Sequence, residues 1–271
     1  MERWENLVKL MISSFFWTEG VVSNRFRQMV GKKARTPCVV LYYHGITGSD
    51  RTRFGKQMGD LKRLAKAVSA DRNEMVAEDV PSVAVTFDDG FQSILENALP
   101  ELIARRIPAS FFIPTGYIGQ KASWIGVKAD EDHPEVVMTE EQIRGLPKDL
   151  INVGSHTVSH QDLRKLGNES LRKEIVDSKK RLEEIIGQKV TMISLPYGEH
   201  DERVIEAAHG AGYRWIFSSL PRLIGRREGV IERVPVRPSD RPLEFRLKIM
   251  GAYRWLPFVL GLKRKLSLLW D

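Results

Sequence analysis

The chain has 271 residues, 42% of them hydrophobic, and its 42 basic and 35 acidic side chains give a formal net charge of +7. This length and composition fit one large α/β barrel or two small domains with an apolar core, and the single cysteine, Cys38, excludes an internal disulfide. Because Cys38 opens an apolar run, we expect it to be a small buried residue.

The positive charge lies at the two ends of the chain. Residues 1–37 carry seven basic and three acidic side chains, residues 241–271 carry seven and two, and residues 38–240 are left with a balance of −2. A nucleic-acid enzyme is expected to carry a basic stripe across its working face, so this distribution argues against one.

Residues 2–17 are predicted to form an amphipathic helix, because apolar side chains recur there at three- and four-residue spacing. Residues 20–37 are polar and basic and are predicted to be a linker. The start of the chain shows no signal-peptide pattern, and the apolar stretches near both ends are shorter than the ~20 residues that span a bilayer.

Residues 38–240 alternate between apolar, β-branched runs and helical stretches, which predicts a parallel α/β sheet or barrel. The long stretch 114–138 contains three glycines and is predicted to be a functional loop over the top of the barrel. The seven strand candidates are 38–43, 83–87, 109–113, 151–154, 190–195, 213–218 and 230–236. The helix candidates between them are 54–69, 91–106, 139–146, 168–186 and 201–211.

Residues 243–270 are apolar and aromatic with basic insertions. Pro257 and Gly261 interrupt this stretch, so two short helices are predicted rather than one. The chain therefore divides into an N-terminal segment, 1–37, a barrel, 38–240, and a C-terminal segment, 241–271.

Two adjacent carboxylates, Asp88 and Asp89, follow the strand candidate 83–87 and precede Gly90 and a helix. The carboxyl ends of strands are where α/β proteins build their sites. Two neighbouring carboxylates repel each other, and they are tolerated where a cation binds one and the other serves as a base. The alternative is a turn with a helix cap, since Asp-Gly favours turns.

Two histidines four residues apart, His156 and His160, follow the strand candidate 151–154. Such a pair, taken alone, is more often a surface or capping feature than a metal site. With Asp89 supplied by another strand end, two imidazoles and one carboxylate make a facial set of three ligands with open positions. This set suits zinc, and also cobalt, nickel or ferrous iron.

Together, Thr-Phe-Asp-Asp-Gly at 86–90 and Ser-His-Thr-x-x-His at 155–160 resemble the NodB-type polysaccharide deacetylases, carbohydrate esterase family four. The resemblance covers roughly 38–240 and implies a distorted (β/α) barrel with fewer than eight strands. It implies that Asp89, His156 and His160 bind the metal and that Asp88 is the general base. Leu-Pro-Tyr-Gly at 195–198 is similar to the third motif of the family. The resemblance implies that the backbone N–H of Tyr197, the residue that follows Pro196, helps to hold the oxyanion.

The sequence departs from the family pattern in two places. Ser194 stands where the third motif usually carries an arginine that orients the base, and we expect Arg233 or Arg237 to reach that place from another strand. No Leu-x-x-His segment follows residue 212 to supply the general acid. His44, after the first barrel strand, resembles the acid of the permuted members that act on poly-N-acetylglucosamine, and the alternative is that it caps the strand.

The resemblance implies a metal-dependent hydrolase that removes N-acetyl groups from an amino-sugar glycan and releases acetate. An O-acetyl esterase using the same centre, and an inactive glycan-binding protein, are the alternatives. The basic, aromatic terminal segments suit an anionic membrane surface, and would otherwise cover the barrel bottom or form a dimer contact. With membrane contact we expect a lipid-linked sugar substrate and a cytoplasmic location at the inner face of the cell membrane.

Overall fold

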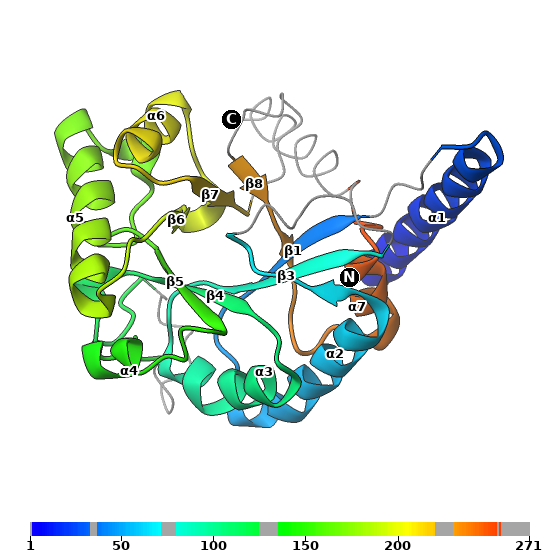
Figure 1. Cartoon of the computed structure of the whole chain (residues 1–271), viewed down its shortest axis with the longest axis horizontal. Helices are drawn as coiled ribbons and strands as arrows, with labels where there is room; N and C mark the ends of the chain where they lie inside the picture. The colour runs from blue at the N-terminus through cyan, green and yellow to red at the C-terminus, as the bar shows by residue number, and fades with distance from the viewer. Residues whose placement is uncertain are drawn as a thin grey trace.

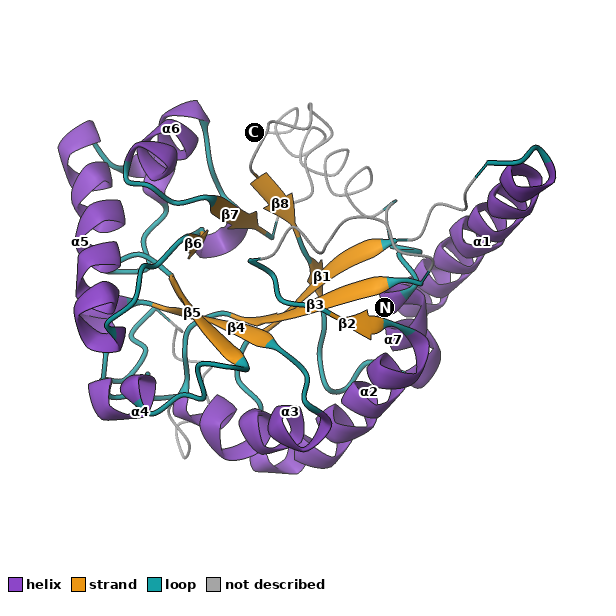
Figure 2. Ribbon diagram, in the orientation of Figure 1, coloured by secondary structure: helices purple, strands orange, loops and turns teal. Residues whose placement is uncertain are grey.

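The computed structural model describes residues 2–32, 37–71, 80–124, 135–219, 230–253 and 255, and describes side chains from residue 9 onwards. Within these residues one nine-stranded sheet has the order β8-β7-β6-β5-β4-β3-β1-β9, and β2 pairs with the start of β3. Every pairing between named strands is parallel. Figures 1 and 2 show the helices arranged around the outside of this sheet.

All seven strand candidates fall on strands of this sheet. The strands are β1 (Cys38–Tyr43), β2 (Lys66–Ala67), β3 (Ser82–Phe87), β4 (Ala109–Ile113), β5 (Ile151–Ser155), β6 (Met192–Ser194), β7 (Trp215–Ser218), β8 (Val230–Glu232) and β9 (Val234–Pro235). Arg233 alone separates β8, which pairs with β7, from β9, which pairs with β1. The last strand candidate therefore joins the two edges of the sheet, and the predicted distorted (β/α) barrel is confirmed as a nearly closed one.

The helices follow the predicted alternation with the strands. They are α1 (Glu2–Met29), α2 (Arg51–Leu64), α3 (Leu99–Arg105), α4 (Glu140–Arg144), α5 (Asn168–Ile186), α6 (Glu202–Gly210) and α7 (Pro242–Ile249), with short turns η1 (Gly48–Asp50), η3 (Ile94–Ala98), η4 (Thr115–Tyr117), η5 (Leu163–Lys165) and η6 (Pro196–Gly198). The bounds of α5 agree with its prediction. Its apolar side, which includes Leu171, Ile175 and Leu182, is buried, and Gly187 ends it with a φ of 67°.

Several local predictions were wrong. The predicted linker 20–37 is helical as far as Met29, because apolar residues continue at helical spacing beyond Gly20. Helix α2 ends at Leu64, and the next residues turn extended to pair with β3. Cys38 is exposed rather than buried, because it is the first residue of β1 and precedes the part of the strand that enters the core.

The barrel core is aromatic beneath the ends of β1, β3 and β4. The Tyr43 and Phe87 rings stack with centroids 5.4 Å apart, and the Phe111 ring meets Phe87 edge-on at 5.3 Å. Phe245 and Ile249 of α7 belong to the same core, so this helix packs against the barrel. Residues 254 and 256–271, which include most of the predicted second C-terminal helix, lie outside the described residues.

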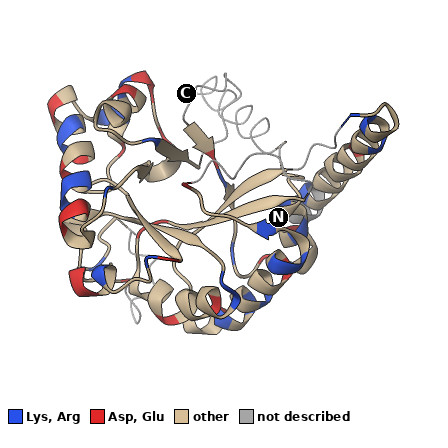
Figure 3. Cartoon of the chain, in the orientation of Figure 1, with Lys and Arg blue, Asp and Glu red and all other residues tan. Residues whose placement is uncertain are grey.

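Charged residues gather on the outer helices, and the strands carry few of them (Figure 3). This is the distribution expected when parallel strands are covered by helices. None of the described helices combines the length and apolar character needed to cross a membrane.

Candidate metal centre and active site

The carboxyl ends of β1, β3, β5 and β6 and the junction of β8 with β9 deliver the candidate site residues to one edge of the barrel. Tyr43 and Phe87 are register partners at the ends of β1 and β3. The Asp88 N–H extends this pairing by donating to the Tyr43 carbonyl at 2.9 Å. The residues that directly follow the strands, His44 and Asp88, are therefore brought side by side.

A tight turn then separates the two adjacent carboxylates. Asp89 and Gly90 have φ values of 67° and 59°, in the left-handed region that favours glycine. A Cβ added to Gly90 would lie 2.5 Å from Ile113 Cδ1, so the turn also packs too closely for a larger residue. As a result Asp88 and Asp89, both buried, face different partners.

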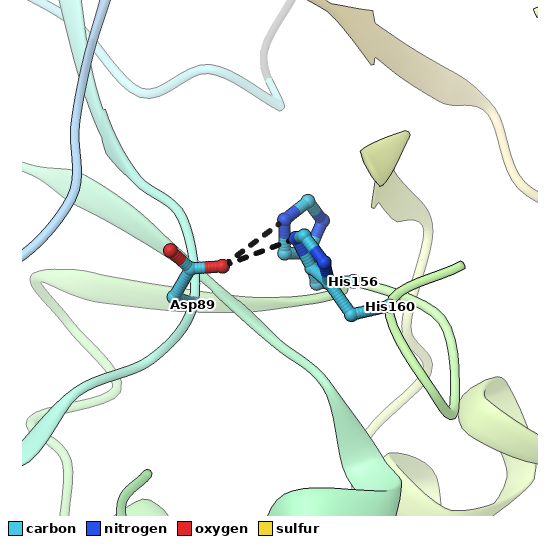
Figure 4. Close-up of side chains that lie close together, drawn as sticks. All are labelled: Asp89, His156 and His160. Atoms are coloured by element: carbon cyan, nitrogen blue, oxygen red, sulfur yellow. Dashed lines mark ion pairs between the residues drawn. The ribbon is translucent and has the colours of Figure 1, made fainter. Parts of the chain in front are cut away.

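Asp89 faces the two histidines. Its Oδ1 atom lies 3.5 Å from His156 Nε2 and 3.3 Å from His160 Nε2 (Figure 4). One ligand atom from each of the three residues lies within 4.8 Å of the other two, and all three side chains are buried. The three residues predicted to bind a metal are thus brought together from two separate strand ends.

The chemistry of these atoms fits a divalent cation. Asp89 Oδ1 is buried and, among the described residues, accepts no hydrogen bond. The His156 Nδ1 atom lies 2.7 Å from the Ser194 carbonyl oxygen, which requires the proton on Nδ1 and leaves the Nε2 lone pair facing Asp89. Ligands bound ~2.0–2.2 Å from a zinc ion at tetrahedral angles lie about 3.4 Å apart, close to the separations seen here.

The charge state of His156 also suits a ligand. Burial, followed by the charge of His160, lowers the pKa of His156 to about 4, although Asp88 and Asp89 act in the opposite direction. The imidazole is therefore neutral at pH 7, as metal binding requires.

The turn that carries His160 is held by a carboxylate from α5. Thr157 and His160 both have positive φ, at 66° and 56°. Glu174 accepts hydrogen bonds from the Val158 and Ser159 backbone N–H groups, each at 2.9 Å, and from the Ser159 hydroxyl at 2.5 Å. This single side chain satisfies the donors of a turn that would otherwise leave them unpaired, and so fixes where His160 points.

Asp88 faces a buried arginine. Arg233 Nη1 and Nη2 donate to the two Asp88 oxygens at 2.8 and 2.7 Å, in a bidentate pair. Nη2 also donates to the Ser194 hydroxyl at 2.8 Å. The guanidinium lies over the Tyr42 ring, 4.7 Å from its centroid. Of the two arginines considered from the sequence, Arg233 contacts Asp88, while the backbone N–H of Arg237 donates to Asp240 at 3.1 Å.

The pair determines the charge of Asp88. Burial alone would raise the pKa of this carboxyl, but the Arg233 guanidinium, His156 and His44 oppose it and hold the pKa well below its usual range. Asp88 is therefore ionised at neutral pH and has a fixed orientation.

The third motif forms the short turn η6 beside the metal centre. Tyr197 has a φ of 58° and is 55% exposed, and its ring meets the His160 ring edge-on with centroids 5.0 Å apart. Pro196 is buried beneath it. The Ser218 hydroxyl donates to the Gly198 carbonyl at 2.8 Å and ties the turn to β7.

His44 is exposed at the rim of the same edge. Its ring meets the Tyr42 ring edge-on, with centroids 5.7 Å apart. The exposed imidazole therefore lies at the same edge of the barrel as the buried Asp88 carboxylate.

Three side chains at the site were not identified from the sequence. Trp124 stacks on His160 with ring centroids 4.6 Å apart, and Glu135 accepts a hydrogen bond from the Ser93 hydroxyl at 3.1 Å next to Gly45. Both belong to the stretch predicted to be a functional loop. The third is Glu174, whose contacts lie 15 and 16 residues back along the chain.

Known proteins of one family are similar to this chain. Residues 76–216 match the family model described as polysaccharide deacetylase. The Bacillus subtilis (strain 168) protein YxkH, which bears the polysaccharide deacetylase name, is 29% identical over 221 residues, covering 77% of this chain and 74% of YxkH. The poly-beta-1,6-N-acetyl-D-glucosamine N-deacetylase of Staphylococcus aureus (strain MSSA476) is 26% identical over 148 residues, which are 51% of this chain and 47% of that protein.

Among solved structures, IcaB from Ammonifex degensii is similar with a TM-score of 0.65 and 24% sequence identity. The alignment covers 80% of this chain and 97% of IcaB. At this identity the likeness concerns the fold alone.

Proposed function

The chain belongs to the polysaccharide deacetylase family, and on this basis we propose that it is a metal-dependent hydrolase that removes N-acetyl groups from an amino-sugar glycan or a lipid-linked amino sugar. The observation that carries the proposal is the buried set Asp89, His156 and His160 beside an ionised Asp88. This arrangement provides cation ligands and a separate proton acceptor within one site.

A divalent ion, proposed to be zinc, held by these three side chains would lower the pKa of water from ~15.7 towards ~7 and polarise the acetyl carbonyl. Asp88 is proposed to take the proton of the attacking water. Arg233 keeps the Asp88 carboxylate ionised and fixes its orientation through two hydrogen bonds. The N–H of Tyr197 is proposed to stabilise the oxyanion, a contribution of ~3–4 kcal/mol for a well-placed donor.

The leaving amine needs a proton, because an amide anion is a very poor leaving group. His44 is proposed to donate it. His44 is exposed and follows Tyr43, the register partner of the residue before Asp88, and this position supports an acid that can reach a bound substrate. General acid catalysis contributes roughly 10²–10⁴-fold to the rate. The products are acetate and a free amine on the sugar.

The proposal is tested by acetate release from N-acetylglucosamine oligomers, from an O-acetylated xylan and from a lipid-linked N-acetylated sugar. Each substrate is assayed with added zinc and with a chelator. Asp88→Asn removes the proton acceptor, and Asp177→Asn, an exposed carboxylate on α5, is the matched control.

We expect metal-dependent release from at least one N-acetylated substrate, lost in Asp88→Asn and kept in Asp177→Asn. Release from the O-acetylated polymer alone would show that the protein is an esterase and not the proposed amide hydrolase. No release from any substrate by a folded, zinc-loaded protein would identify an inactive glycan-binding protein. Full activity in chelator would overturn the metal-dependent mechanism.

A further inference from the structure

Helix α1 carries a stripe of exposed apolar side chains that the barrel does not use. Each member of this stripe exposes between 66% and 84% of its surface, and they are Met11, Phe15, Val22, Phe26 and Met29. At 3.6 residues per turn their directions fall within about 60° of one another, and the stripe extends for about 27 Å. Large apolar side chains seldom line up in this way on a surface that has no partner.

The opposite side of α1 is fixed to the body of the protein. Ser13 is fully buried and its hydroxyl accepts a hydrogen bond from Trp255 Nε1 at 2.8 Å. Leu10, Ile12 and Phe16 pack against a cluster that includes Leu247 of α7. The helix is thus held in one orientation with its apolar stripe outward, and Figure 1 shows it projecting from the barrel.

The charges around the projecting half of α1 are positive. Within the described residues 17–32, Arg25, Arg27 and Lys32 are basic and Glu19 is the single acidic residue. Figure 3 shows basic residues along this helix. Lysines and arginines near an apolar stripe are attracted to anionic lipid headgroups, at about 1 kcal/mol for each residue close to the surface.

A second copy of the chain fits this surface poorly. A heptad seam that contained Met11, Phe15, Val22 and Met29 would also have to contain Thr18 and Arg25. Pairing two copies would moreover bring two basic segments together. An apolar stripe bordered by basic residues instead matches the pattern of a helix that lies in the plane of a membrane interface.

We propose that the Met11–Met29 face of α1 docks the protein onto the surface of an anionic lipid bilayer, with the apolar stripe in the acyl boundary and the basic residues against the headgroups. The surface lies outside the catalytic residues, so the inference does not rest on the proposed function.

The test is flotation of the full chain with vesicles of phosphatidylcholine and phosphatidylglycerol. Phe15→Ser/Phe26→Ser removes the two aromatic members of the stripe. Val80→Ser/Ile103→Ser, which removes two exposed apolar side chains elsewhere on the barrel, is the matched control. Circular dichroism and thermal melting check that each variant folds, and light scattering after size exclusion measures the oligomeric state.

The unmodified chain and the control are expected to float with anionic vesicles and to lose most of this binding in 0.5 M salt or with pure phosphatidylcholine, because salt screens the headgroup charge. The Phe15→Ser/Phe26→Ser variant is expected to partition at least about tenfold more weakly. Equal flotation of the variant, or no flotation of the unmodified chain, overturns the proposal. A dimer that the variant abolishes, without vesicle binding, assigns the stripe to a second copy instead.

Discussion

Arg233 donates parallel hydrogen bonds of 2.8 and 2.7 Å to the two oxygens of Asp88, 145 residues earlier in the chain. The same guanidinium donates to the Ser194 hydroxyl, at the position where the family motif usually carries its own arginine. The residue that closes the barrel between β8 and β9 therefore also fixes the proposed base. One side chain thus links the closure of the sheet to the orientation of Asp88.

Replacing Arg233 with Gln is expected to lower kcat/KM by about 10²–10⁴-fold, because Asp88, the proposed base, loses its negative charge and its fixed orientation. Without the guanidinium, burial raises the pKa of Asp88, so protonation removes the base at a higher pH than in the unmodified enzyme. The acidic limb of the pH profile should therefore move upward. An unpaired buried carboxylate should also cost about 3–5 kcal/mol of unfolding free energy.

The measurements for this variant are a pH–rate profile, bound zinc and thermal unfolding. Arg237→Gln is the control, because Arg237 is exposed and donates to Asp240 through its backbone N–H. Zinc content should stay unchanged in both variants. An Arg233→Gln enzyme with the activity and pH profile of the unmodified chain would refute the positioning role.

The sequence allowed the barrel to be predicted because its strands are continuous apolar runs that end at helices. Strand β2 was missed because two residues, Lys66 and Ala67, carry no pattern of their own and become a strand only by pairing with β3. Helix α1 was predicted too short because Gly20 and the polar residues around it outweighed the apolar spacing that continues to Met29.

The meeting of Asp89, His156 and His160 was predictable because parallel strands deliver their carboxyl ends to one edge of a barrel. The partner of Asp88 could be narrowed to two arginines, which share one face of an extended strand because they are four residues apart. The structure distinguishes them by their burial, since Arg233 is buried and Arg237 is exposed. The role of Glu174 could not be predicted, because it consists of hydrogen bonds to a turn that lies outside its own helix. Nothing in the local sequence of α5 distinguishes it from its exposed neighbours.

Zinc should stabilise the folded protein if Asp89 and the two histidines bind it. A ligand at 100 times its Kd contributes about 2.7 kcal/mol, which corresponds to a rise of several degrees in the unfolding midpoint. Asp89→Asn should lose most of this rise, while Asp177→Asn should keep it. Differential scanning calorimetry with and without zinc makes the comparison, and an equal rise in both variants would place the ion elsewhere.

His44→Gln tests the proposed acid. Acetate release from an N-acetylated sugar should fall about 10²–10⁴-fold, because the amine leaves only when protonated. Hydrolysis of 4-nitrophenyl acetate should change little, since nitrophenolate leaves without a proton. His209→Gln, on the exposed side of α6, is the control. Equal losses on both substrates would point to a structural role for His44 and count against proton donation.

Glu174 should act on metal affinity rather than on the chemistry, because it touches the turn before His160 and not the site itself. Glu174→Ala is expected to weaken zinc binding by ~10–100-fold, the usual cost of losing an outer partner of a metal ligand. Glu174→Gln keeps one acceptor oxygen, so its zinc affinity should lie between those of the unmodified chain and of Glu174→Ala. Glu169→Gln, which breaks only an exposed ion pair with Lys173 on the same helix, serves as the control. Competition with a zinc-binding dye measures each affinity, and saturating zinc should restore most of the activity. Unchanged affinity in Glu174→Ala would show that the turn holds His160 without this carboxylate.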